Sequence, residues 1–358
     1  MKVAHIVSHL DTGGAEKLVA EISNLMVPCG VKIKVITLFN GRGVPFQILD
    51  KDNIELIELN YSSKYNPKIA RELYKLTRDC DIVHTHTYYA QLYASIFIPK
   101  IKLVTTEHST NNNRRGKKIM RIFDYLMYRR YMKIICISEA TKNSLNKWLK
   151  STKDKSIIIH NGVNLSKYLD ASSIPRAELG VDKSKIILTC VGRLEKAKNQ
   201  EALIRAFKGV DVDAAILLLI GHGQKEKELK ELVKELKLND KVIFLGQRND
   251  VERILKTSDI FILPSLWEGF GLSAVEAVAA GLPLLLSNVA GLKDVINALN
   301  AKVDYFDPVD VSDITLKINE MCNDTINVGQ TYSIRKDKLE SYSLDNMVNK
   351  YLESYKVN

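Results

Sequence analysis

The chain has 358 residues, of which 46% are hydrophobic and 26% charged, and its formal net charge is +10. This length suffices for two domains, and the composition is that of an ordinary globular protein. The longest apolar stretches, around 214–220 and 277–286, are too short to span a bilayer, and no secretory signal follows Met1. We therefore expect a cytoplasmic protein whose contact with any membrane is peripheral.

The five cysteines lie far apart in the sequence, which predicts neither a zinc site nor a disulfide framework and suits a reducing compartment. The positive charge is uneven. Residues 1–160 hold 26 of the 52 Lys and Arg but only 14 of the 42 Asp and Glu. The first half of the chain should therefore face an anionic partner or be strongly solvated.

Strands and helices alternate through the first half. The expected strands are Val3–Val7, Lys32–Leu38, Ile54–Leu59, Ile82–Thr85 and Ile134–Ile137, and the expected helices include Glu16–Met26 and Pro67–Thr77. This order predicts a parallel sheet covered on both faces. The glycine pair Gly13-Gly14 after the first strand would let a substrate approach backbone amides, although such a pair more often only connects a strand to a helix.

Histidines gather where strands of this half should end, namely His84, His86 and His108. Ligands of open parallel sheets bind at the carboxyl ends of the strands. A metal site is one interpretation. We favour neutral histidines bonded to backbone or to substrate hydroxyls, because no carboxylate or cysteine shares their spacing. His108 is the candidate site residue among them.

A basic stretch, 111–155, holds thirteen Lys and Arg, Arg114 and Arg115 among them, against three acidic residues. Within it the predicted helix Ile119–Tyr131 carries an apolar face formed by Ile119, Ile122, Phe123 and Leu126. The stretch could lie against anionic lipid headgroups, or it could be a solvated basic helix packed on the sheet. Nucleic acid is disfavoured as a partner because aromatic residues are not interleaved on a strand platform.

The second half repeats the alternation after irregular sequence that extends to Lys185. Its expected strands are Lys185–Val191, Ala214–Ile220, Lys241–Leu245, Asp259–Leu263 and Leu282–Ser287, and the tail Asp345–Tyr355 has a helical pattern. We place the domains at 1–165 and 166–340, followed by a terminal helix in 341–358. The predicted fold class is α/β, with two parallel-sheet domains.

One junction in this half offers an anion site. The stretch 264–277 follows a predicted strand and opens a helix; Gly269 and Gly271 allow close approach of the backbone, and a helix start favours phosphate. Glu268 and Glu276 could accept hydrogen bonds from sugar or ribose hydroxyls, or could belong to an acidic surface loop and a capped helix. Upstream, Arg193 and Lys198 could straddle a diphosphate without a metal, or be a solvated basic turn.

The order of these motifs resembles that of retaining glycosyltransferases of family 4, over nearly the whole chain. The motifs are Gly13-Gly14-Ala-Glu, His84-Thr-His86, Glu107-His108, Ser138-Glu139, His160-Asn-Gly162-Val, Gly192-Arg193 with Lys198, and Pro264-Ser-x-x-Glu268-Gly-Phe-Gly-Leu-x-x-x-Glu276-Ala with Gly281-Leu-Pro283. The most specific part is the segment with Glu268 and Glu276.

The resemblance implies a GT-B fold: two Rossmann-like domains facing across a cleft, with acceptor mainly on the first, donor mainly on the second, and the terminal helix crossing back to the first. It implies that Arg193 and Lys198 hold the donor diphosphate, that Glu268 binds the donor sugar and Glu276 the ribose, and that no metal or cofactor is needed. The remaining implied donor contacts are His108 at the sugar O6, Gly14 near the diphosphate, the backbone after Gly246 at the base, and the backbone of Phe270, Gly271, Leu272 and Ser273.

The expected function is transfer of a sugar from a UDP- or GDP-sugar to a glycan acceptor with retention of configuration. The basic first domain favours an acceptor on a polyprenyl diphosphate, met at the inner face of the plasma membrane. Two alternatives stay open: a nucleotide-sugar hydrolase or epimerase of the same fold, and a non-catalytic sugar-nucleotide-binding protein.

Overall fold

The structure is a computed structural model that describes residues 1–356 apart from 12, 111, 113–114, 213 and 329–335. The chain forms two compact units. Unit 1 comprises Met1–Gly162 and Tyr342–Asn358, and unit 2 comprises Val163–Ser341. The predicted boundaries lay at 165 and 340, and the roles predicted for the two domains stay predictions. No helix of the described residues is both long and apolar enough to cross a bilayer.

Unit 1 is built on a seven-stranded parallel sheet of order β3-β2-β1-β4-β5-β6-β7. Its strands are β1 (Lys2–Val7), β2 (Lys32–Thr37), β3 (Glu55–Glu58), β4 (Ile82–Thr85), β5 (Leu103–Glu107), β6 (Lys133–Cys136) and β7 (Ser156–Ile158). Its helices are α1 (Gly14–Met26), α2 (Val44–Ile48), α3 (Lys68–Leu76), α4 (Tyr88–Phe97), α5 (Lys118–Tyr128), α6 (Glu139–Trp148) and α15 (Leu344–Tyr355).

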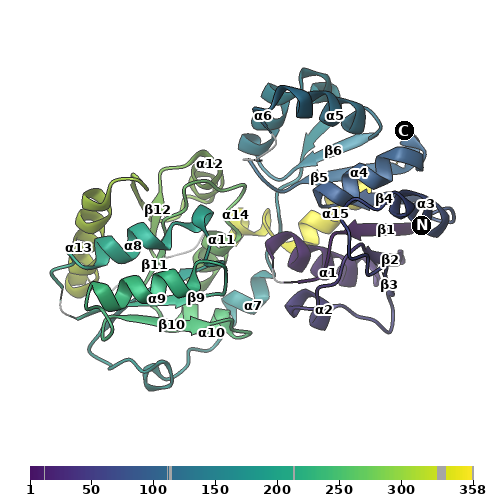
Figure 1. The fold of residues 1–358 in the computed structure, drawn as a ribbon. Coiled ribbons are helices and arrows are strands. Elements are labelled where there is room, and N and C mark those ends of the chain that lie inside the picture. The colour runs from purple at the N-terminus through teal and green to yellow at the C-terminus, as the bar shows by residue number, and fades with distance from the viewer. Residues whose placement is uncertain (12, 111, 113–114, 213, 329–335, 357–358) are drawn as a thin grey trace. The chain divides into compact units, whose positions relative to one another are not determined.

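The two faces of this sheet bury separate apolar clusters. Because side chains alternate along a strand, Val3 and Val7 of β1 pack with α1 and α15 on one face, and Ala4 and Ile6 pack with α3 and α4 on the other. The C-terminal helix α15 therefore belongs to unit 1, as Figure 1 shows. Gly162 permits its approach, because a Cβ at this position would lie 2.6 Å from the Cα of Leu344.

Unit 2 is built on a six-stranded parallel sheet of order β10-β9-β8-β11-β12-β13. Its strands are β8 (Ile186–Val191), β9 (Ala215–Ile220), β10 (Val242–Gly246), β11 (Ile260–Leu263), β12 (Leu284–Ser287) and β13 (Val303–Phe306). Its helices are α7 (Leu165–Leu169), α8 (Gln200–Phe207), α9 (Glu226–Glu235), α10 (Val251–Thr257), α11 (Leu272–Ala280), α12 (Ala290–Leu299), α13 (Val311–Val328) and α14 (Lys336–Glu340). The predicted strands are present, with ends shifted by one or two residues.

The helix predicted over 119–131 is confirmed as α5, although it ends earlier, at Tyr128. The segment predicted as irregular up to Lys185 was wrong in part, because it contains α7 and a short 3-10 turn, Arg176–Leu179. The edge strand β13 and the long helix α13 were not predicted at all. The sequence around Val303 is short and polar, with only a weak strand signal.

Candidate functional site

The site of unit 2 lies where the order of its parallel sheet reverses. From β8 the chain runs outward through β9 and β10 and then returns to β11, which pairs with the other side of β8. Ligands of open parallel sheets bind at this point, outside the carboxyl ends of the strands. Arg193 and Lys198 follow β8, and Glu268 follows β11. The fold thus brings two separate sequence motifs together.

Lys198 and Glu268 are in direct contact, with the Lys198 ammonium donating to Glu268 Oε1. The hydroxyl of Ser265 donates to the same oxygen at 2.7 Å. The Glu268 side chain is only 11% exposed and that of Lys198 20%, so solvent screens this ion pair incompletely. The carboxylate is therefore held in one orientation by a cation and a hydroxyl.

The two loops that carry this pair are also bonded through their backbones. The amide of Leu266 donates to the carbonyl of Ala197 at 2.9 Å, and Asn199 Nδ2 donates to Pro264 O at 3.2 Å. Asn199 adopts a left-handed conformation (φ 54°), which Asn tolerates better than most residues. These bonds fix the distance between the loops, and the motif analysis did not identify Asn199 as a source of them.

Arg193 is the more exposed cation. Its guanidinium pairs with Glu195 at 3.2 Å and is 53% exposed, and its carbonyl accepts a hydrogen bond from Gln200 Nε2 at 3.0 Å. The backbone is thus fixed while the guanidinium can reorient. Such an arrangement suits a residue that meets an anionic ligand from the solvent side.

Helix α11 begins shortly after Glu268 in the chain, and its first backbone amides can bind a ligand. Gly271 precedes it with φ 81°, a left-handed conformation that favours glycine, and no side chain caps the helix. The first amides of a helix, here those of Leu272 and Ser273, have no acceptor within it and attract anions. The ring of Phe270 is buried at 2% exposure, so this residue can meet a ligand only through its backbone.

Three further residues of unit 2 bear on the candidate site, namely Glu276, Gly246 and Gly291. Glu276 is buried at 9% exposure on α11, one turn after its start. Gly246 ends β10 with φ 63°, and the space where a Cβ would stand is open. A Cβ on Gly291 would collide with the carbonyl of Glu268, so this glycine, at the start of α12, determines where the Glu268 backbone lies.

Gly14 and His108 belong to unit 1. Gly14 is the exposed first residue of α1, and the Glu16 carboxylate lies against Gly13, where a side chain at Gly13 would collide with it. His108 follows β5 and is partly buried. Both residues therefore lie at the carboxyl ends of parallel strands, as predicted, and their roles toward a ligand stay predictions.

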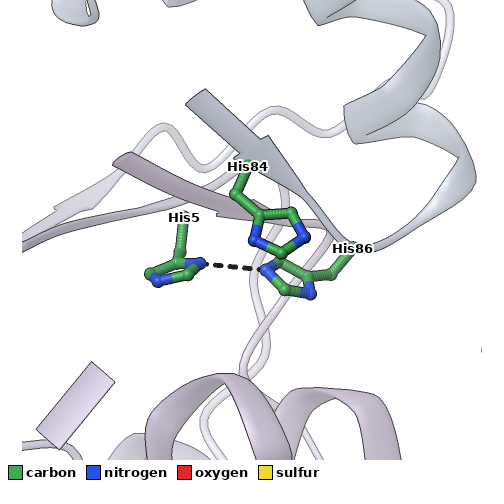
Figure 2. A group of neighbouring side chains, drawn as sticks. All are labelled: His5, His84 and His86. Carbon is green, nitrogen blue, oxygen red and sulfur yellow. Dashed lines mark hydrogen bonds between the residues drawn. The ribbon is translucent and has the colours of Figure 1, made fainter. Parts of the chain in front are cut away.

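His108 ends a chain of buried imidazoles. His5 Nδ1 lies 2.9 Å from His86 Nε2, and His86 Nδ1 lies 3.4 Å from His108 Nε2. Figure 2 shows the first of these bonds, with the His84 ring beside it. His5 of β1 and His84 of β4 lie on the same face of the sheet as α15, and His86 and His108 follow the ends of β4 and β5. His5, which the motif analysis missed, connects the chain to the core.

His84 is bonded to hydroxyl groups. Its Nδ1 lies 2.6 Å from the Tyr355 hydroxyl and its Nε2 lies 2.7 Å from Thr106 Oγ1. His5, His84 and His86 each offer a ring nitrogen within 4.8 Å of the others, which could suit a metal ion. However, both His84 nitrogens already have partners, and this favours neutral, hydrogen-bonded imidazoles. Their partners are other side chains, whereas we expected backbone or substrate.

These histidines should make the protein less stable in acid. Burial lowers the pKa of His5 to about 3 and that of His108 to about 4, and it lowers the pKa values of His84 and His86 well below the usual range. The unfolded chain, titrating near pH 6.5, binds more protons below that pH. The free energy of unfolding should therefore be greatest above pH 6.5 and decrease by up to about 1.4 kcal/mol per pH unit per histidine as pH falls toward 5.

Urea denaturation between pH 7.5 and 5 measures this slope, in a range where most carboxylates stay ionised. His5→Asn, which keeps an amide near the Nδ1 position, should reduce the slope. The control Asn239→Gln should not, because this exposed amide side chain binds no proton in the range. An unfolding free energy that does not change with pH would show that these imidazoles are not held neutral.

Glu107 lies beside His108 but on the opposite face of the sheet. It is 5% exposed and accepts hydrogen bonds from Gln91 Nε2 at 2.7 Å, from the Tyr128 hydroxyl and from Arg115 at 3.2 Å. Three donors compensate this buried carboxylate. Glu107 therefore connects the end of β5 to α4 and α5. Arg114, which lies in the same basic loop, is outside the described residues.

Two family models match the sequence, one for each half of the chain. Residues 12–167 match the model of Glycosyltransferase Family 4, and residues 173–336 match that of Glycosyl transferases group 1. The chain belongs to glycosyltransferase family 4. The two parallel sheets are those of a GT-B fold, as expected from the resemblance.

Proteins of similar sequence include other glycosyltransferases. The glycosyltransferase is 29% identical to UDP-Gal:alpha-D-GlcNAc-diphosphoundecaprenol alpha-1,3-galactosyltransferase of Escherichia coli, over 78% of this chain and 79% of that protein. It is 26% identical to N-acetyl-alpha-D-glucosaminyl L-malate synthase of Bacillus anthracis, over 81% and 80%. A crystal structure of Anabaena HepE in complex with UDP and glucose has a TM-score of 0.84 and 19% identity, covering 99% of both chains, and shows the shared fold.

Proposed function

We propose that this glycosyltransferase moves a sugar from a UDP- or GDP-sugar to a glycan acceptor carried on a lipid diphosphate, with retention of anomeric configuration. The observation that carries the proposal is the contact of Lys198 with Glu268 beside the start of α11. A cation, a carboxylate and unpaired helix amides within one loop cluster suit a sugar joined to a diphosphate. The UDP and glucose bound in the HepE crystals support this donor class.

Each site residue then has a role. Lys198 and Arg193 bind the diphosphate, whose charge grows as the bond to the sugar breaks. Glu268 accepts hydrogen bonds from sugar hydroxyls, and its bond from Ser265 keeps it oriented while Lys198 turns to phosphate. The sugar and the phosphate are contacted by the backbone of four residues, Phe270, Gly271, Leu272 and Ser273. Glu276 binds the ribose, and the backbone after Gly246 contacts the base.

The transition state resembles an oxocarbenium ion, so donors aimed at the leaving diphosphate supply the main stabilisation. The bond from the sugar C1 to the diphosphate oxygen breaks, and a bond from C1 to the acceptor oxygen forms on the same face. The acceptor proton passes to the leaving phosphate. No protein nucleophile is needed for this sequence of bonds.

In unit 1, the proposed substrate contacts are His108, through a sugar hydroxyl, and Gly14, through its backbone. The His108 ring is oriented by its contact with His86, which in turn contacts His5. The E. coli relative, whose name specifies a diphosphoundecaprenol acceptor, supports a lipid-linked acceptor here. Such an acceptor places the enzyme at the inner face of the plasma membrane, in synthesis of a surface polysaccharide or glycoconjugate.

A screen of nucleotide sugars by thermal shift tests the donor class, because a bound donor stabilises the folded state. One UDP- or GDP-sugar should raise the unfolding temperature, and incubation with acceptor should yield a product with retained configuration by NMR. Free sugar released equally well without acceptor would instead indicate a hydrolase.

Transfer should not depend on a divalent cation, because Lys198, Arg193 and the α11 amides replace the metal at the diphosphate. Dialysis against EDTA should change turnover by less than about twofold, since the charge compensation comes from the protein. Activity that returned only after addition of Mg²⁺ or Mn²⁺ would contradict this assignment.

A further inference from the structure

Exposed apolar side chains are concentrated on α4, on the turn after it, and on α5. Eight of the thirteen large hydrophobic side chains that are exposed among the described residues fall between 96 and 126. They are Ile96, Phe97, Ile101, Ile119, Ile122, Phe123, Tyr125 and Leu126, each between 44% and 65% exposed. A groove between the two helices is lined by Leu92 and Ile96 of α4 and by Phe123 and Leu126 of α5. We call these eight residues the apolar face.

Helix α5 buries Asp124, Tyr128 and Met127, and it exposes most of its other apolar side chains together with Lys118 and Arg121. Inward, Asp124 is 2% exposed and accepts a hydrogen bond from Trp148 Nε1 at 2.9 Å, and Tyr128, 1% exposed, donates to Glu107. These buried polar contacts fix the rotation of the helix. The outward position of Ile119, Ile122, Phe123 and Leu126, at helical spacing, therefore follows from contacts on the opposite side.

Among the described residues between 96 and 130, every exposed charged side chain is basic. The acidic residues between 96 and 130 are Glu107 and Asp124, and both are buried. Lys100, Lys117, Lys118, Arg121 and Arg129 are exposed in the same span. A protein partner of mixed surface charge would not specifically match this pattern, whereas an anionic bilayer offers acyl chains for the apolar residues and headgroup phosphates for the cations.

We propose that the apolar face inserts into an anionic lipid bilayer, with Ile122 and Phe123 among the inserted residues and the surrounding lysines and arginines at the headgroups. This goes beyond the attraction predicted from the basic stretch alone, because it adds burial of apolar side chains and includes Ile96, Phe97 and Ile101, which lie outside that stretch. The functional reason for membrane contact rests on the proposed function, in which the acceptor is lipid-linked. The insertion itself can be measured without donor or acceptor.

Cosedimentation of the full chain with phosphatidylcholine vesicles, with and without phosphatidylglycerol, tests the proposal. The wild type should bind the anionic vesicles, and part of that binding should persist in high salt. The variant Ile122→Ser/Phe123→Ser should bind them at least about tenfold more weakly, since two apolar side chains no longer leave water. The variant Lys117→Gln/Lys118→Gln/Arg121→Gln should lose mainly the salt-sensitive part.

The matched control is Leu316→Ser on α13 of unit 2, which replaces another side chain of similar exposure, 54%, and should bind as the wild type does. Thermal unfolding of each variant shows whether it folds, and the shift of its unfolding temperature by UDP shows whether it keeps a donor site. A failure of the proposed function can therefore be distinguished from a failure of membrane insertion. Equal vesicle binding by wild type and Ile122→Ser/Phe123→Ser would overturn the proposal. So would a concentration-dependent dimer that only this variant abolishes, since a second copy would then cover the face.

Discussion

Replacing Lys198 by Ala should lower kcat/KM by about 100- to 1,000-fold, because a cation aimed at a leaving group that gains charge is worth several kcal/mol in a partly buried site. Lys198 is the less exposed of the two cations and already contacts Glu268. Its loss therefore removes a diphosphate contact and also frees the carboxylate. Steady-state kinetics with the donor found by the screen measure the effect.

Arg193→Ala should have a smaller effect, because the guanidinium is half exposed and solvent screens it. The double variant should lose nearly all turnover while keeping its unfolding temperature. Lys196→Ala provides the control: Lys196 is exposed on the same loop, and its removal should change kcat/KM by less than about twofold. Turnover in the double variant close to that of the wild type would refute the diphosphate assignment.

Replacing Glu268 by Ala should lower kcat/KM by about 10- to 100-fold, through loss of hydrogen bonds to the donor sugar that strengthen in the transition state. Glu268 is 11% exposed and bonded to Ser265 and Lys198, so it is pre-oriented before a sugar arrives. Binding of the nucleoside diphosphate without its sugar should change little, which separates this role from that of Lys198.

Two variants refine this assignment. Ser265→Ala should produce a smaller loss than Glu268→Ala, because it removes one orienting bond and leaves the carboxylate. Glu201→Gln, on the exposed surface of α8, should be neutral. Kinetics with the intact donor and calorimetry with UDP or GDP make the comparison. If Glu268→Ala weakened the free nucleotide as strongly as the whole donor, Glu268 would not be the sugar-binding residue.

Much of the fold could be predicted because its elements are local and strongly patterned. Buried parallel strands such as β9 are continuous apolar runs, and α3 has a clear helical period, so both were found to within two residues. The edge strand β13 was missed. An edge strand is half exposed, so its sequence carries polar residues and resembles a loop.

The candidate site was only partly visible. The motifs identified Lys198 and Glu268 separately, but their contact depends on the order of β8 and β11 in the sheet, which no local pattern encodes. Gly291 and Asn199 contribute through the backbone conformations that they allow. Gly291, for example, lies against the Glu268 carbonyl, where a side chain would collide. The Tyr355 hydroxyl reaches His84 across 271 residues of sequence, so the partner of that imidazole could not be read from its motif.

The exposed face of α5 shows a second reason why a sequence pattern does not fully determine the structure. Its apolar spacing was recognised, and the usual expectation is that such a face packs inward. The structure buries Asp124 and Tyr128 instead, since Trp148 and Glu107 provide partners for them. Helical periodicity identifies a face but does not determine which way it points. That direction depends on contacts with other elements.

Calorimetric titration of the wild type and of Arg193→Ala/Lys198→Ala with UDP, GDP and their sugars tests the central claim most directly. The account predicts that one nucleoside diphosphate, and more strongly its sugar, binds the wild type at a single site and binds the double variant at least about tenfold more weakly, in line with the loss of two charge-assisted contacts. Absence of binding to the wild type, or equal binding to both proteins, would contradict it.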